Sequence, residues 1–126
     1  VLELCGMKNF RNIKVWNQSM SLCTQIILRM NELPKSETYE LISQLKRASI
    51  SIVSNIAEGS GRGSDKDFCR FLHISLGSSY EVETQLIMAN NIYGLEIDDL
   101  LGELVSVQKQ LQAFIKVLNQ RIREAA

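Results

Sequence analysis

Hydrophobic residues recur along this chain at steps of three and four, which is the spacing of one face of an α-helix. The second of four such stretches shows the pattern most fully, with apolar residues at Leu41, Leu45, Ala48, Ile52 and Ile56. Together the stretches predict helices over about residues 13–31, 37–58, 65–91 and 97–122. Alternating apolar runs, which are typical of strands, are almost absent. We therefore expect an all-α fold.

Short connections separate the predicted helices. Pro34 stops the first helix, because the residue before a proline avoids the helical conformation. The glycine-rich segment 59–63 ends the second helix, and Ser64 followed by Asp67 opens the third as a variant of the capping box. The last turn falls at 90–94. Three short connections between long helices predict an antiparallel up-down-up-down four-helix bundle.

The third and fourth helices carry further signals. Leu104, Leu111 and Leu118 repeat every seven residues in the fourth helix, as in a coiled-coil seam. The basic residues Arg121 and Arg123 follow at its end, where they complement the helix dipole. In the middle of the third helix lies Gly77. Glycine destabilises a helix interior by roughly 1 kcal/mol relative to alanine, so we expect another backbone to approach closely there. The alternative is a break of the helix at this glycine.

Length and composition indicate one soluble domain without a disulfide framework. The chain has 126 residues and three cysteines, which are an odd number and lie far apart in the sequence. We expect them to be free thiols in a reducing cytoplasm; they are Cys5, Cys23 and Cys69. No apolar run approaches the roughly 20 residues of a membrane span, so we expect no membrane partner.

The first residues differ from the rest of the chain. Met7 opens the segment MKNF, which has the form of a natural start, so we expect residues 1–6 to be an upstream extension. We predict a flexible N-terminal extension over residues 1–9 and the bundle domain over residues 10–126.

Enzymatic chemistry finds little support in the sequence. A di-metal site in a helical bundle requires a Glu-x-x-His motif on two helices. The chain has one histidine, His73, and the residue three before it is Arg70. The segment GSGRGS at 59–64 lacks the Gly-Lys-Ser/Thr ending of a phosphate-binding loop and follows a helix rather than a strand. We expect no catalytic residues, no metal and no cofactor, because no acid, base and nucleophile can be assembled.

Polar residues lie on or beside the apolar faces of the second and third helices. They are Arg47, Asn55, Glu58, Arg70, Ser78 and Glu81. Antiparallel packing around the 59–64 corner would bring Glu58 near Arg70. It would also bring Arg47 near Glu81, because each helical residue rises about 1.5 Å and equal distances from the corner stay level. Such a network of charged hydrogen bonds would either fix the helix register and subunit contacts or form a functional site.

Several segments of the chain resemble a known family. They are KVWNQS at 14–19, PKSETYEL at 34–41, SNIAEG at 54–59 and GSSYEVETQL at 77–86. In these segments, and from Phe10 to about Leu118 overall, the chain is similar to the four-helix bundle family named for the 23S ribosomal RNA intervening-sequence protein, also called ribosomal-protein-like. The resemblance implies a small bacterial protein, an antiparallel bundle and a homo-oligomer, with a ring of five subunits as the expected form.

The charge pattern bears on nucleic-acid binding. Fourteen basic and fourteen acidic residues give a formal net charge of zero, which counts against strong non-specific binding. Five basic residues nevertheless fall toward one end of the predicted bundle, and these are the candidate nucleic-acid ligands: Lys46, Arg47, Arg62, Lys66 and Arg70. A five-fold ring would repeat the cluster and strengthen its field. The alternative is a solvated corner that pairs with its own carboxylates, such as Asp65 and Asp67.

Two hypotheses for function follow. The first is a non-enzymatic oligomer that binds ribosomal RNA or another structured nucleic acid. The second is an oligomeric scaffold or accessory protein that contacts other proteins and no nucleic acid. The chain also resembles a related bundle family whose members serve as reverse-transcriptase accessories in diversity-generating retroelements. Those relatives are strongly basic, whereas this chain has no net charge, which counts against that particular role. For either hypothesis, the apolar residues Val53, Ile74 and Ile87 are candidates for burial between subunits.

Overall fold

The computed structural model describes residues 9–126, and the side chains of all of these except 35–38. A short 3-10 helix, η1 (Phe10–Asn12), leads into α1 (Lys14–Met30), α2 (Lys35–Ser60), α3 (Asp65–Tyr93) and α4 (Asp98–Ala125). The described part of the chain contains no strand, so the all-α prediction is confirmed. Most of the predicted extension, residues 1–9, lies outside the described residues. Asn9 is the exception, and its side chain caps η1.

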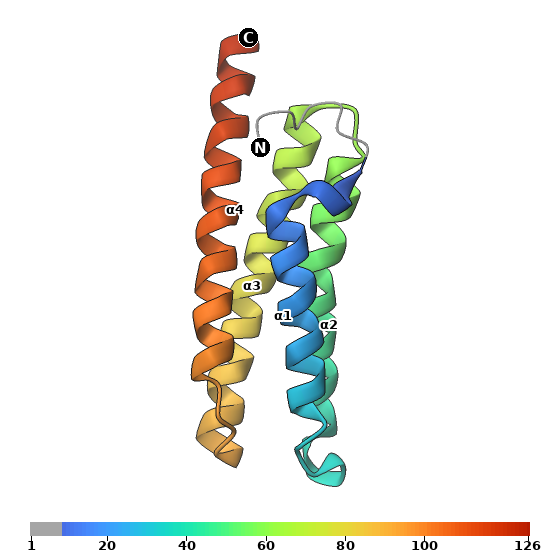
Figure 1. Cartoon of the computed structure of the whole chain (residues 1–126), viewed down its shortest axis with the longest axis vertical. Coiled ribbons are helices and arrows are strands. Elements are labelled where there is room, and N and C mark those ends of the chain that lie inside the picture. Colours follow the sequence, from blue (N-terminus) through green and yellow to red (C-terminus); the bar gives the residue numbers. More distant parts are fainter. Residues whose placement is uncertain (1–8) are drawn as a thin grey trace.

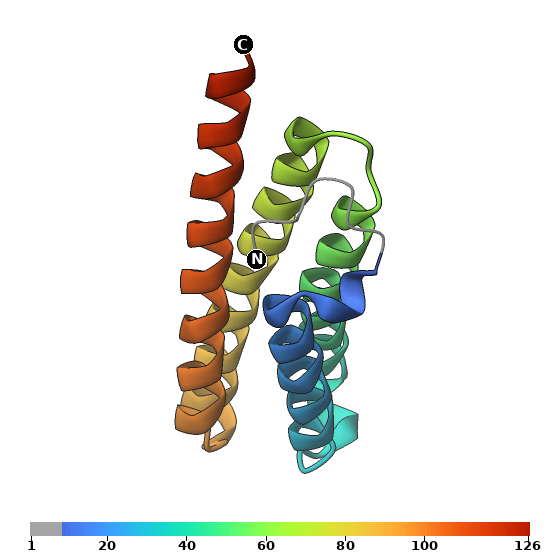
Figure 2. The same ribbon diagram turned by 45° about the horizontal axis from the view of Figure 1, so that its top comes forward.

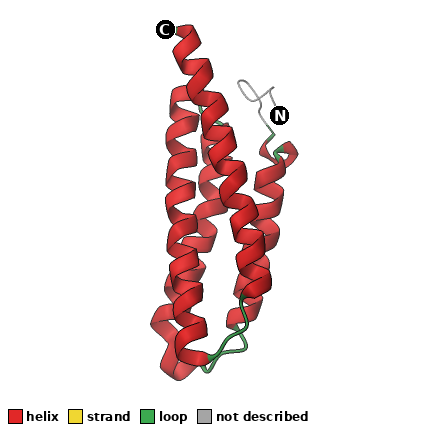
Figure 3. Ribbon diagram, turned by 90° about the vertical axis from the view of Figure 1, so that its left-hand side faces the viewer, coloured by secondary structure: helices red, strands yellow, loops and turns green. Residues whose placement is uncertain are grey.

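The four long helices lie side by side in an elongated bundle (Figure 1). α2 and α3 form the most extensive pair, and each also packs against one further helix, α2 against α1 and α3 against α4. Contacts along the α2–α3 pair join Ser51 to Ser78 and Arg47 to Glu81, so residue numbers fall on one helix as they rise on the other. α1 has 17 residues and is the shortest of the four, and the end of α4 extends past the other helices (Figures 2 and 3).

The core runs the length of the bundle and is built from the positions that the periodicity indicates. Leu104, Leu111 and Leu118 are all fully buried, as the seven-residue repeat in α4 predicts. Leu45 and Ile56 of α2 are fully buried as well. Burying a leucine or isoleucine side chain stabilises the folded state by about 1.5–3 kcal/mol, so this apolar column is the main favourable contribution to the fold. Among the described residues, no helix combines the length and apolar character needed to cross a membrane.

Caps define the ends of α3. The side chain of Ser64 accepts a hydrogen bond from the backbone N–H of Asp67 at 3.1 Å, as predicted. At the other end Gly94 adopts a left-handed conformation with φ of 70°, and its N–H donates to the carbonyl of Asn90. A glycine accepts this conformation without the strain that a Cβ atom would introduce. Between these caps α3 is one continuous helix that includes Gly77, which excludes the predicted alternative of a helix break.

The close backbone approach occurs at Gly59, not at Gly77. A Cβ atom at residue 77 would meet nothing within 4 Å, so the prediction for that glycine is wrong. A Cβ atom at residue 59 would lie 2.6 Å from Cβ of Phe71 and 3.0 Å from Cδ1 of Phe68. The last turn of α2 therefore rests directly on the first turns of α3, and only glycine permits that contact.

A charged clamp joins the end of α1 to the start of α4. The guanidinium of Arg29 donates to both carboxylate oxygens of Asp99, at 3.1 and 2.8 Å, and to the carbonyl of Glu96 at 2.7 Å. The hydrogen bond from Arg29 holds the pKa of the Asp99 carboxyl below its ordinary value of 3.8. The pair is partly exposed, so it contributes no more than about 1 kcal/mol.

Replacing Gly59 by alanine should destabilise the protein. We expect Gly59→Ala to lower the free energy of unfolding by about 1–3 kcal/mol, because the new methyl group overlaps Phe71. Gly77→Ala is the matched control and should raise it by up to about 1 kcal/mol, since the site is open and alanine favours helix. Urea unfolding followed by circular dichroism measures both. Equal stability of the two variants would contradict the close contact.

The Arg29–Asp99 clamp should make stability depend on pH in the acid range. Because the pKa of Asp99 is lowered in the folded state, its contribution is fully present above the ordinary value of 3.8. That contribution is lost as the pH falls below 3.8 through the folded pKa. Wild type should therefore be more stable than Asp99→Asn by up to about 1 kcal/mol at pH 7, and the difference should disappear at the lowest pH that still permits folding. A difference that does not change with pH would rule out this linkage.

Candidate functional site

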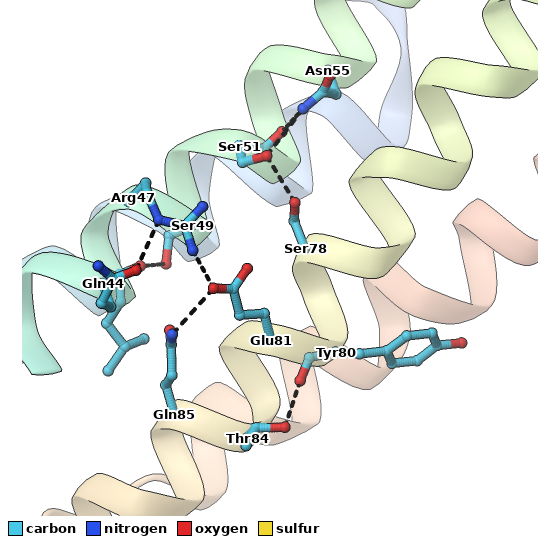
Figure 4. Close-up of polar contacts among 11 residues, drawn as sticks. Gln44, Arg47, Ser49, Ser51, Asn55, Ser78, Tyr80, Glu81, Thr84 and Gln85 are labelled. Carbon is cyan, nitrogen blue, oxygen red and sulfur yellow. Dashed lines mark hydrogen bonds and ion pairs between the residues drawn. The ribbon is translucent and has the colours of Figure 1, made fainter.

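A row of polar side chains follows the line where α2 meets α3, and we call it the α2–α3 seam (Figure 4). Its residues are Gln44, Arg47, Ser51, Asn55, Ser78, Glu81 and Gln85. In its lower part Arg47 donates to Glu81 and, at 2.9 Å, to the side-chain oxygen of Gln44. Gln85 reaches the same carboxylate oxygen of Glu81 at 3.4 Å. The structure thus brings Arg47 and Glu81 together, as the register argument predicts.

The upper part of the seam is made of small side chains. The hydroxyl groups of Ser51 and Ser78 lie 2.7 Å apart, and Asn55 donates to the Ser51 hydroxyl at 3.0 Å and to its carbonyl at 2.8 Å. Beneath them the buried hydroxyl of Ser75 donates to the carbonyl of Ile52 at 2.8 Å. These contacts satisfy polar groups beside the core and hold α2 and α3 in one register.

The pairing of Glu58 with Arg70 is not present, so that expectation is wrong. Glu58 accepts from Arg62 at 2.7 Å, and the nearest carboxylate to Arg70 is Asp67 at 3.8 Å. The reason is local. Gly61 at the end of α2 keeps a right-handed helical conformation, so Arg62 stays one turn after Glu58 on the same face.

An aromatic ring organises the basic groups at this end of the bundle. The guanidinium carbon of Arg62 lies 4.8 Å from the centre of the Phe71 ring, and that of Arg70 lies 4.5 Å from it. A cation over an aromatic face is attracted by the ring quadrupole. We define the arginine corner by six residues: Glu58, Arg62, Lys66, Asp67, Arg70 and Phe71. Its charged side chains are exposed or half-exposed, whereas Phe71 is buried beneath them.

The predicted basic cluster of five residues divides into two groups. Arg62, Lys66 and Arg70 belong to the arginine corner. Arg47 lies eleven residues before Glu58 on α2, which is roughly 16 Å along the axis. Lys46 is half-buried and lines a surface pocket of about 330 Å³ with these residues: Met30, Asn31, Tyr39, Ile42 and Ser43. Neither Lys46 nor Arg47 adds to the field at the corner within one Debye length of about 8 Å.

A comparison with protein families places the seam and the corner within one matched region. The sequence model described as 23S rRNA-intervening sequence protein matches residues 11–113. The chain belongs to the 23S rRNA-intervening sequence protein family. The matched region of this family member includes the whole seam and the whole arginine corner and stops within α4. Among curated proteins, none matches the chain.

The end of α4 in this family member supplies basic groups that sequence reasoning did not place at the site. Arg121 pairs with Asp65 at 3.1 Å, which ties the last turns of α4 to the first turn of α3 beside the corner. Arg123 follows and donates to Gln120 at 2.6 Å. The sequence showed only that Arg121 and Arg123 lie at the end of a helix, where they complement its dipole. Periodicity within one helix does not show which part of another helix lies beside that end.

The candidate subunit contacts differ in how much surface they offer. Val53 is only 6% exposed, because it extends the buried face of α2 next to Ile52. It has almost no area left for a second subunit, so its assignment is wrong. Ile74 and Ile87 are each 42% exposed and remain available. Three further exposed hydrophobic residues of α3 were not predicted: Tyr80, Met88 and Ile92.

Groups that carry metal or nucleophilic chemistry are sparse. Among the side chains that the structure describes, no three from His, Cys, Asp or Glu come close enough to hold a metal ion. Cys23 and Cys69 are free and buried, and burial raises the pKa of both thiols above their usual value. Both are therefore protonated at neutral pH and are poor nucleophiles. Cys5 lies outside the described residues.

Proposed function

We propose that this protein is a non-enzymatic, antiparallel up-down-up-down bundle that binds structured RNA through the arginine corner. Ribosomal RNA is the first partner to test, since the family description refers to it. The observation that carries the proposal is the position of Arg62 and Arg70, two exposed guanidinium groups over one aromatic ring. Guanidinium groups bind phosphate oxygens through two parallel hydrogen bonds, and half or more of the hydrogen bonds from proteins to DNA go to the phosphate and sugar backbone.

The geometry of the corner favours recognition of the RNA backbone over recognition of bases. Phe71 is 6% exposed, so the corner presents no open aromatic face on which a base could stack. Arg70 has its nearest carboxylate at 3.8 Å, and Lys66 is exposed. These side chains can reach phosphates while the bundle remains rigid behind them. We therefore propose that the protein reads the shape of a folded RNA and not its sequence.

Self-association would compensate for the zero net charge. One corner supplies few positive groups, whereas several corners on one assembly would bind a folded RNA together and raise the overall affinity. We propose a homo-oligomer in the cytoplasm, with a ring of five as its form. A short apolar stripe on α3, made of Met88 and Ile92, supports this proposal because these two residues lie one turn apart on the same helix face and stay exposed.

A test of RNA binding compares charge changes inside and outside the corner. We expect wild type to bind a fluorescent hairpin from 23S ribosomal RNA, with an affinity that falls as salt rises. Arg70→Gln should weaken binding by about fivefold or more and make the salt dependence shallower, because one phosphate contact is lost. Lys109→Gln, an exposed change on α4 away from the corner, is the control and should have little effect. Fluorescence anisotropy over a salt series provides the measurement, and binding that is absent or insensitive to salt would refute the proposal.

A second function, an assembly scaffold without RNA contact, is favoured by the apolar stripe alone. Exposed apolar residues in one line are typical of protein interaction sites. On this proposal α3 contacts protein, either another copy or a different partner, and the arginine corner serves only solubility. Protein partners without RNA in a pull-down would favour the scaffold over the first proposal.

The RNA-binding proposal includes self-association through α3, and so does the form of the scaffold in which α3 contacts another copy. We expect light scattering to give a multiple of the 14.3 kDa chain mass, with five copies as the expected number. Ile92→Glu should dissociate the assembly, since it places a charge in the stripe that the assembly would bury. Ile92→Val keeps the surface apolar and should leave the assembly intact. Association is excluded if wild type is a monomer at micromolar concentration, and the stripe is excluded if Ile92→Glu remains assembled.

A further inference from the structure

We propose that Glu58 is a built-in substitute for an RNA phosphate at the arginine corner. In the free protein its carboxylate occupies Arg62, and it gives way when a phosphodiester group of RNA binds there. This inference rests on the proposed RNA binding and adds the way in which that site is regulated. Glu58 then acts as an internal competitor that sets the affinity of the corner.

The two arginines at the corner are held ready for an anion. Both guanidinium carbons lie within 5 Å of the centre of the Phe71 ring, so they are closer together than the Debye length of about 10 Å at 0.1 M salt. Two positive groups at this separation repel each other and attract the same anion. Because the ring already orients them, little side-chain freedom is lost when an anion binds.

The carboxylate of Glu58 stands in an unfavourable place on its own helix. It lies in the last turn of α2, where the helix dipole disfavours negative charge and where no basic residue of that turn offsets it. Its hydrogen-bonding partner is Arg62. Asp67 differs, because it lies in the first turn of α3, where the dipole favours an acid. Asp67 therefore has a structural reason for its position, whereas Glu58 has one only through the arginine.

The Arg62–Glu58 pair is suited to exchange. Its side chains are 43% and 55% exposed, and exposed ion pairs contribute little to stability, so the pair opens at small cost. A phosphodiester offers the same arrangement of two charged oxygens as a carboxylate and can accept both hydrogen bonds of the guanidinium fork. RNA thus replaces Glu58 without any change in the backbone.

The decisive variant is Glu58→Gln, which removes the competing charge and keeps the size of the side chain. We expect it to bind the 23S ribosomal RNA hairpin about two- to fivefold more tightly than wild type, the factor that corresponds to releasing one exposed ion pair. The dependence of affinity on salt should become steeper, because Arg62 now contacts phosphate fully. Glu32→Gln is the control, because it makes the same charge change in the turn before α2, whose 26 residues span about 39 Å.

Each outcome of this anisotropy experiment separates the inference from the proposed function. If wild type binds RNA and Glu58→Gln binds no more tightly, the inference is wrong while the RNA-binding function stands. If Glu32→Gln gains as much as Glu58→Gln, general charge explains the effect and the inference is also wrong. If neither wild type nor Glu58→Gln binds, both proposals fail. In the double variant Glu58→Gln/Arg62→Gln the gain should disappear, and a gain that persists without Arg62 would overturn the competition.

Discussion

The contact between the last turn of α2 and the first turns of α3 determines much of what this molecule presents to its surroundings. Gly59 allows the backbone of α2 to meet the Cβ atom of Phe71, and that contact fixes where the aromatic ring lies. The ring in turn holds Arg62 and Arg70 at the surface. From this corner the two helices run together, with polar contacts at successive levels of the seam. The packing at Gly59 therefore also determines the geometry of the arginine corner.

The fold follows from the sequence because helix burial is encoded within each helix. Heptad leucines of α4 such as Leu111 are fully buried, and each predicted helix lies within three residues of its observed ends. The Arg47–Glu81 contact also follows, since rigid rods of equal rise keep residues level on both sides of a corner. Gly77 was misjudged for a related reason. A glycine in a helix interior shows only that a side chain is missing. The space beside Gly77 is open, whereas the close approach of α2 to α3 occurs at Gly59.

The candidate site was harder to predict, because its partners depend on turn geometry. Periodicity places Glu58 and Arg70 opposite each other, but the turn after α2 keeps Arg62 in helical register and offers Glu58 a nearer partner. Five basic residues that look close in sequence spread along a helix that rises about 1.5 Å per residue, so only three of them meet. Arg121 joins them from the far end of the chain, and no local pattern could show this.

Hydrogen bonding, and neither exposure nor the number of charges, distinguishes the corner from the seam, since the side chains of Arg47 and Arg62 are 54% and 43% exposed. Arg47 shares its hydrogen bonds with Gln44 and Glu81, and Glu81 also accepts from Gln85, so removing Arg47 from the seam would leave several groups unpaired. Arg62 and Arg70 hold exposed carboxylates, one at hydrogen-bonding distance and one at 3.8 Å. Water can replace such carboxylates at little cost. A chain of zero net charge can therefore stay neutral in isolation and still carry, at this corner, arginines whose exposed ion pairs open at little cost.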